Sequence, residues 1–121
     1  MLKSNKALVA LDLEGNHFGL ASAKAFRKAL EVNDTLRSLN VENCSFTCRG
    51  DEQSGVVELA KGLRLNKGLR NLNLRNNQID DVSMHRAKHA GMRRRHGSNI
   101  LINYELGSGR SVLPTYPFFP L

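Results

Sequence analysis

Two pairs of side chains in this sequence are of types that can bind metal ions. Cys44 and Cys48 lie four residues apart, and His85 and His89 have the same spacing. Zinc fingers place their two ligand pairs about a dozen residues apart. Here, 36 residues separate Cys48 from His85. We therefore expect no metal site and no cofactor, and two cysteines are too few for a disulfide framework.

The sequence contains no motif that supports catalysis. The segment "GSGR" at 107–110 lacks the spacing and the lysine of a phosphate-binding loop. Ser83 and Ser98 lie near the histidines, but no further group completes a nucleophilic site. We expect a protein that is not an enzyme.

Two short motifs are typical of binding peptides. Residues 49–51 read "RGD", the tripeptide that adhesion receptors recognise in extracellular proteins. The N-terminus shows no secretion signal, so a polar surface insertion is the better interpretation. Pro114, Pro117 and Pro120 repeat every three residues, which is the period of polyproline II. Arg110 lies one position too far away for the usual SH3 ligand pattern, and we expect an extended terminus.

The positive charge is concentrated in the last third of the chain. Residues 1–82 hold 12 Lys and Arg against 10 Asp and Glu, whereas residues 83–121 hold 6 against 1. The basic segment 85–97 has no interleaved aromatic residues for base stacking. It offers an alternative function, the binding of nucleic acid or of an acidic surface, through Arg86, Lys88, Arg93, Arg94 and Arg95.

The length of 121 residues predicts one domain, and 40% hydrophobic with 24% charged residues is typical of a soluble protein. No stretch reaches the roughly 18 apolar residues of a membrane helix. Without a signal peptide, a cytoplasmic location and no membrane partner are expected.

Three segments share one repeated template. They are "LVALDLEGN" at 8–16, "LRSLNVENC" at 36–44 and "LRNLNLRNN" at 69–77. Each follows L-x-x-L-x-[LV]-x-x-[NC], and the periods are 28 and 33 residues. An asparagine stands three positions before each one: Asn5, Asn33 and Asn66.

The segments between the templates also match one another. Moving Ala23, Phe26 and Leu30 forward by 33 gives Val56, Leu59 and Leu63, and this spacing places each set on one face of a helix. We expect strands near 9–13, 37–41 and 70–74 and helices near 22–32 and 55–65.

The helix ends carry typical signals. Ser22 and Ser54 are the predicted N-caps. Glu58 is expected near the positive end of its helix dipole. Asn33 and Asn66 are expected to end their helices in a left-handed conformation.

These repeats resemble the leucine-rich repeat family, in particular its ribonuclease-inhibitor-like branch, over residues 5–82. The resemblance implies an α/β fold, a short solenoid with a parallel sheet on the concave face and helices on the convex face. It also implies that Cys44 fills the turn position of Asn16 and Asn77, which bonds neighbouring backbone. The phrase "NDTLRSLNVEN" looks like the repeat region of tropomodulin, which suggests capping of the actin pointed end.

The template weakens after Asn77. The helix positions corresponding to Phe26 and Leu30 hold Ala87 and Gly91. "LINYELGSG" at 101–109 reads as a degenerate fourth strand, with Leu101 lying 32 residues after Leu69. We expect repeats over 1–82, and two alternatives stay open for 83–121: a basic degenerate repeat that acts as a cap, or a partly disordered tail. The chain could also be a piece of a longer array.

The residues between the core leucines of each strand should face outward, because side chains alternate across a strand. They are expected to form columns on the concave face that bind a partner protein of unknown identity. The columns are Ala10/Ser38/Asn71, Asp12/Asn40/Asn73 and Glu14/Glu42/Arg75.

Overall fold

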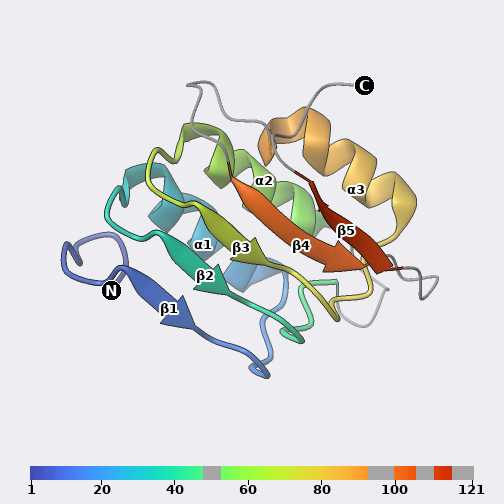
Figure 1. The fold of residues 1–121 in the computed structure, drawn as a ribbon, viewed down its shortest axis with the longest axis horizontal. Coiled ribbons are helices and arrows are strands. Elements are labelled where there is room, and N and C mark those ends of the chain that lie inside the picture. The colour runs from blue at the N-terminus through green and yellow to red at the C-terminus, as the bar shows by residue number, and fades with distance from the viewer. Residues whose placement is uncertain (48–52, 93–99, 106–110, 116–121) are drawn as a thin grey trace.

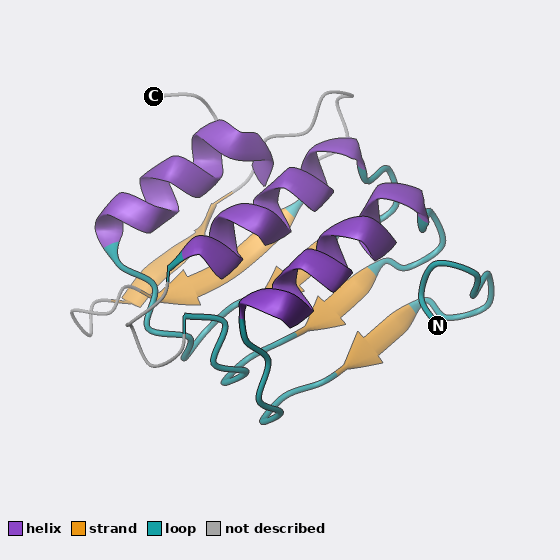
Figure 2. Ribbon diagram, turned by 180° about the vertical axis from the view of Figure 1, so that it is seen from behind, coloured by secondary structure: helices purple, strands orange, loops and turns teal. Residues whose placement is uncertain are grey.

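In the part of the chain that the structure describes, five strands form one sheet, and the helices cover one of its faces (Figures 1 and 2). The computed structural model describes the backbone of residues 1–47, 53–92, 100–105 and 111–115, and the side chains of residues 1–47, 53–91 and 100–105. The strands are β1 (Ala10–Asp12), β2 (Ser38–Asn40), β3 (Asn71–Asn73), β4 (Leu101–Glu105) and β5 (Ser111–Thr115). They lie in chain order, with β1 to β4 parallel and β5 antiparallel to β4.

The helices are α1 (Leu20–Val32), α2 (Ser54–Leu65) and α3 (Asp81–Ala87), which continues into the π-helical turn η1 (Lys88–Met92). They lie side by side in front of the sheet in Figure 2, which views the molecule from the helix side. This arrangement is the α/β repeat architecture that the sequence predicts. Among the described residues, no helix has the length and apolar character to cross a bilayer.

The predicted helix caps are wrong. Gly19 and Gln53 precede α1 and α2, so Ser22 lies within α1 and Ser54 is the first residue of α2. Glu58 lies beyond the first turn of α2, which contains no acidic residue. Its carboxylate pairs with cationic side chains instead of the helix terminus.

Asn33 and Asn66 end their helices in an extended conformation, with φ of −83° and −71°, so the left-handed conformation predicted for them is also wrong. The physical reason is that each side chain is tied to the preceding repeat. Nδ2 of Asn66 donates to the carbonyl oxygens of Leu30 at 2.9 Å and Asn33 at 2.8 Å. Nδ2 of Asn33 likewise donates to those of Leu2 and Asn5. We call Asn5, Asn33 and Asn66 the asparagine ladder.

The core lies between the sheet and the helices. Leu39, Leu72 and Ile102 stand opposite one another on β2, β3 and β4, and each is at most 1% exposed. Three aromatic rings lie beside them, with centroids 5.4–5.9 Å apart: Phe18, Phe26 and Phe46.

Small residues let the helices approach closely. A Cβ atom on Gly62 of α2 would lie 2.8 Å from the Cα of Arg27 on α1, so only glycine fits there. Ala87 and Gly91 are both buried against α2. The two small residues at the positions of Phe26 and Leu30 therefore make a close helix contact.

The register of the fourth strand differs from the predicted one. Leu101 lies opposite Asn71, and Ile102 lies opposite Leu72. The template had instead aligned Leu101 with Leu69, two residues away. The template alignment would bury Leu101 and would place Ile102 at the position of Arg70, which is exposed. In the structure Ile102 is buried and Leu101 is half-buried, in agreement with the observed pairing. The backbone hydrogen bond from Leu101 N to Arg70 O, 2.8 Å long, fixes the register.

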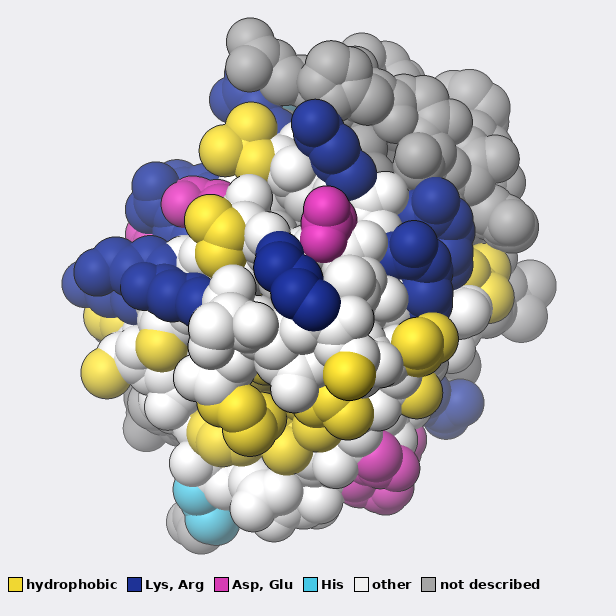
Figure 3. All heavy atoms as spheres, turned by 90° about the vertical axis from the view of Figure 1, so that its left-hand side faces the viewer, with side chains coloured by type: hydrophobic (Ala, Val, Ile, Leu, Met, Phe, Trp, Pro, Cys, Tyr) yellow, Lys and Arg dark blue, Asp and Glu magenta, His cyan; other side chains and the backbone are white. Residues whose placement is uncertain are grey.

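The end of the fold beside β1 and α1 exposes apolar side chains, which form the yellow region in the centre of Figure 3. They surround a hollow of about 440 Å³. Its apolar lining includes Met1, Leu2, Leu11, Leu13, Phe18 and Phe26.

Candidate functional site: the concave face

The concave columns are aligned as the repeats predict. Ala10, Ser38 and Asn71 stand opposite one another, as do Asp12, Asn40 and Asn73. The fourth strand extends the columns with Leu101 and Asn103. Sequence reasoning missed these two residues, because the columns were assigned only for the three complete templates.

The central column is held by its own backbone. The Oδ1 atoms of Asp12, Asn40 and Asn73 each accept a 3.0 Å hydrogen bond from the N–H group two residues later. This local bond fixes each side chain at the end of its strand. The column is therefore a rigid row of polar groups.

The column of Glu14, Glu42 and Arg75 differs along its length. Glu14 is exposed. Glu42 accepts hydrogen bonds from Nδ2 of Asn73 at 2.9 Å and Nδ2 of Asn76 at 2.8 Å. Both of its oxygens are thus used inside the molecule, so only Glu14 offers a carboxylate without a described partner.

Arg75 is also paired within the chain. Its guanidinium lies 3.8 Å from the carboxylate of Glu105, which accepts a further hydrogen bond from the backbone N–H of Asn76. Sequence reasoning missed Asn76 and Glu105. The alternation of side chains along β4 would have placed Glu105 on the concave face once the register was known.

The turns after the strands repeat as well. Gly15, Asn43 and Asn76 have φ of 80°, 52° and 56° at equivalent positions. Glycine and asparagine adopt this left-handed conformation at little cost. The chain therefore reverses in the same way after β1, β2 and β3.

The comparisons with known proteins agree with this geometry. The chain is 38% identical over 85 residues to NACHT, LRR and PYD domains-containing protein 4C of Mus musculus, which is 69% of this chain and 8% of that protein. It is 38% identical over 79 residues to leucine-rich repeat-containing protein 45 of Gallus gallus, covering 65% of this chain and 11% of that protein. Leiomodin-1 of Rattus norvegicus is 34% identical over 61 residues, half of this chain and 10% of its own length.

The chain is a leucine-rich repeat protein. Its relatives include leiomodin, a tropomodulin-like protein, as the resemblance had suggested. No model of a known protein family matches the sequence. The chain spans about a tenth of the length of the relatives it matches.

Cys44 fills the turn position of the second leucine-rich repeat. Its Sγ lies 3.1 Å from the carbonyl oxygen of Leu13, and its backbone N–H donates to Oδ1 of Asn77 at 3.0 Å. The side chain is 0% exposed, and burial raises the pKa of the thiol. A buried thiol with a raised pKa suits a structural role better than a reactive one.

The convex face of the leucine-rich repeats carries a charge network. Arg27 on α1 contacts Glu58 on α2 at 2.9 Å and Glu31 at 3.1 Å, and Lys61 contacts Glu58 at 3.2 Å. The hydrogen bond from Arg27 is the main cause that lowers the pKa of Glu58. The same bond raises the pKa of Arg27.

The predicted basic segment is described only in part. Arg86 is exposed on α3, and Nζ of Lys88 lies 6.0 Å from the ring centroid of Tyr104. Arg93, Arg94 and Arg95 lie outside the described residues. The alternative function of this segment stays a prediction.

The structure also describes only some of the cysteines, histidines and motif residues that the sequence analysis considered. The rings of His85 and His89 are 4.5 Å apart, and no three candidate ligands cluster among the described side chains. Cys48 and the "RGD" at 49–51 lie outside the described residues, as do Pro117 and Pro120. Pro114 lies in β5, at the edge of the sheet.

Proposed function

We propose that this leucine-rich repeat chain is a non-catalytic module that binds a partner protein through its concave face. Its relatives support a protein-interaction role in general. The observation that carries the concave face is the polar row Asp12, Asn40, Asn73 and Asn103, which stands in register on four strands. A row of fixed hydrogen-bonding groups loses little conformational entropy when a partner binds.

The amide of Asn40 illustrates how the row would act. Its oxygen accepts the N–H of Glu42, so its Nδ2 group is the part left to donate to a partner. Asp12 contributes an acceptor at the equivalent place in β1. A partner chain crossing the strands would meet donors and acceptors at the strand spacing of about 4.8 Å.

The test adds bulk to the concave face without removing these hydrogen bonds. Ser38 and Asn71 stand side by side in the first column. Their side chains make no hydrogen bond or ion pair within the described part of the chain. The double variant Ser38→Arg, Asn71→Arg should block binding sterically. Ala21→Arg, at an exposed position of α1, places the same side chain on the helix layer as a control.

The measurement is affinity capture from cell lysate by the full chain, followed by calorimetry with the purified partner. We expect loss of the partner with the double variant and retention with Ala21→Arg. Equal binding by all three proteins would show that the concave face is not the binding surface.

A further inference from the structure

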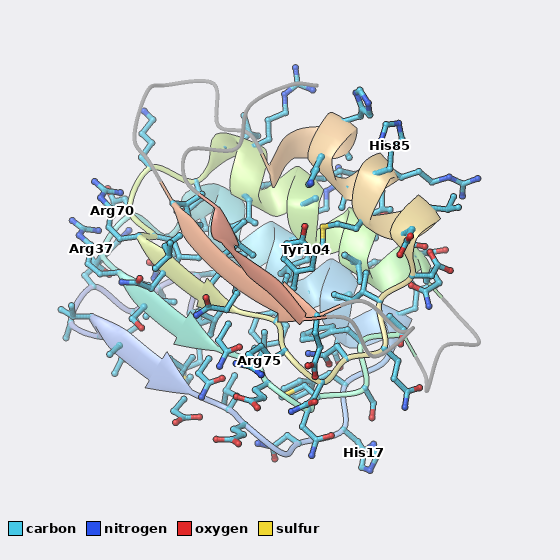
Figure 4. The ribbon with its side chains drawn as sticks, turned by 45° about the vertical axis from the view of Figure 1, so that its right-hand side comes forward. His17, Arg37, Arg70, Arg75, His85 and Tyr104 are labelled. Atoms are coloured by element: carbon cyan, nitrogen blue, oxygen red, sulfur yellow. The ribbon has the colours of Figure 1, made fainter. Side chains whose placement is uncertain are left out.

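Two arginines stand next to each other where the strands begin. Arg70 N donates to Arg37 O at 2.7 Å, so the two residues occupy the same position in successive repeats. Figure 4 shows both side chains together at one end of the sheet, with Arg75 towards the opposite end. We call Arg37 and Arg70 the arginine pair.

Each guanidinium is anchored to the backbone of its own loop. Nη1 of Arg37 donates to the carbonyl oxygen of Asp34 at 2.7 Å. Nη1 of Arg70 donates to those of Lys67 at 3.1 Å and Gly68 at 2.8 Å. These bonds use one nitrogen of each group and leave Nε and Nη2 for a further ligand.

The loop between the repeats is shaped around this arrangement. A Cβ atom on Gly68 would lie 2.5 Å from Nη1 of Arg37 and 2.5 Å from the carbonyl oxygen of Asp34. Glycine is therefore the residue that allows the Arg37 side chain to lie against this loop.

The arginine pair lacks a carboxylate partner within the part of the chain that the structure describes. The carboxylate of Asp34, in the same loop, lies 3.6 Å from Nζ of Lys6 instead. Like charges on adjacent strands repel one another, and an anion between them would remove that cost. Both arginines are exposed, so such an anion can reach them.

We propose that the arginine pair binds two acidic side chains of an extended segment in the partner protein. This deepens the proposed function and rests on it. Alternate residues of an extended chain lie about 6.6 Å apart on one side, a spacing that two long arginine side chains on strands about 4.8 Å apart can span. Arginine forks bind carboxylates through paired hydrogen bonds, and preset orientation lowers the entropy lost.

The position next to the arginine pair, in the first repeat, holds an apolar residue. Arg37 N donates to the carbonyl oxygen of Val9, so Val9 is the equivalent residue of the first repeat. Its side chain is 56% exposed. The preferred segment therefore carries an apolar residue beside its acidic pair.

The test uses the full chain and two synthetic nonapeptides. One carries glutamates at alternate positions beside a valine, and the other carries glutamines at the same positions. The readout is the set of arginine Nε–H signals in ¹H–¹⁵N NMR spectra, assigned in the unmodified protein. We expect the glutamate peptide to shift the signals of Arg37 and Arg70 saturably, and the shifts to shrink as salt is added.

Matched variants and other anions sharpen the test. Arg37→Lys with Arg70→Lys keeps the charge but removes the fork, and should weaken binding at least about fivefold. Lys24→Ala with Lys28→Ala, on the exposed side of α1, should leave it unchanged.

Three outcomes would overturn the proposal: equal shifts from the glutamine peptide, shifts spread over all arginines, or equal shifts from inorganic phosphate or single-stranded DNA. If the peptide test fails while Ser38→Arg, Asn71→Arg abolishes partner binding, only the proposal of an acidic segment is rejected. Failure of both tests would reject the concave face as well.

Discussion

The asparagine ladder allows a quantitative test of how the repeats are joined. Asn66 is 3% exposed, and its Nδ2 donates to two carbonyl oxygens of the preceding repeat. Its Oδ1 accepts the N–H groups of Gly68 at 3.1 Å and Leu69 at 2.8 Å. The Asn66→Ala variant removes all of these bonds and leaves their partners buried.

The expected magnitude follows from the cost of each lost bond. A typical hydrogen bond contributes about 1 kcal/mol net, and a buried group left without a partner costs about 1–3 kcal/mol. Partial relaxation and water entry reduce the sum, so we expect Asn66→Ala to lower the free energy of unfolding by about 3–5 kcal/mol. That is a large share of the roughly 5–15 kcal/mol typical of a domain.

Asn5 supplies a matched control within the same ladder. Its Oδ1 accepts the N–H groups of Ala7 and Leu8, at the edge of the fold, where water can replace it. Asn5→Ala should cost only about 0.5–1.5 kcal/mol. The assay is urea unfolding followed by circular dichroism. If the two variants lose similar free energies, or Asn66→Ala loses less than about 1 kcal/mol, the ladder does not join the repeats as described.

Three further predictions concern the core, the charge network and the buried thiol. Leu39→Ala should lower the free energy of unfolding by about 2–5 kcal/mol, because the side chain is 1% exposed, and an unchanged denaturant midpoint would contradict this. Arg27 lowers the folded-state pKa of Glu58, so this stabilisation is present above the unfolded pKa of about 4.5 and is lost as the pH falls through the folded pKa. Glu58→Gln should therefore flatten the loss of stability below about pH 4.5, and identical pH profiles for variant and parent would exclude this contribution. In a Cys48→Ser background, Cys44 should react with a thiol reagent at least about tenfold more slowly in the folded than in the unfolded protein, and equal rates would show that it is accessible.

The core and the first three strands were predictable because they depend on spacing alone. The template that selects Leu39 and Leu72 also sets their register, since equivalent positions of stacked repeats face one another. The helix positions followed from the same period.

The fourth strand shows where spacing is insufficient. "LINYELGSG" fits the template at Leu101, yet Leu101 lies opposite Asn71. The template alignment would bury Leu101 and leave Ile102 at the exposed position of Arg70, whereas Ile102 is the buried residue. Both residues are apolar, so the sequence alone did not show which of them faces the core.

The sequence predicted which residues lie on the concave face, but not which of their polar groups are already bonded within the molecule. Glu42 is on the concave face as expected, yet its oxygens bind Asn73 and Asn76. These contacts join residues 31 and 34 positions apart. Such contacts depend on how far one repeat is shifted relative to the next, and the template carries no information about that shift. The arginine pair was missed for a related reason, because its anchoring depends on loop carbonyls.

The reversal of direction at β5 has a consequence for self-association. A sheet edge with unpaired backbone groups can recruit a strand from another molecule. β1 to β4 are parallel, so molecules stacked head to tail could continue the parallel sheet only if the β1 edge of one met the β4 edge of another. β5 covers that edge of β4 and contains Pro114, which has no N–H group to donate. Pairing of two β1 edges would be a twofold contact that closes after two copies instead of growing into a fibre.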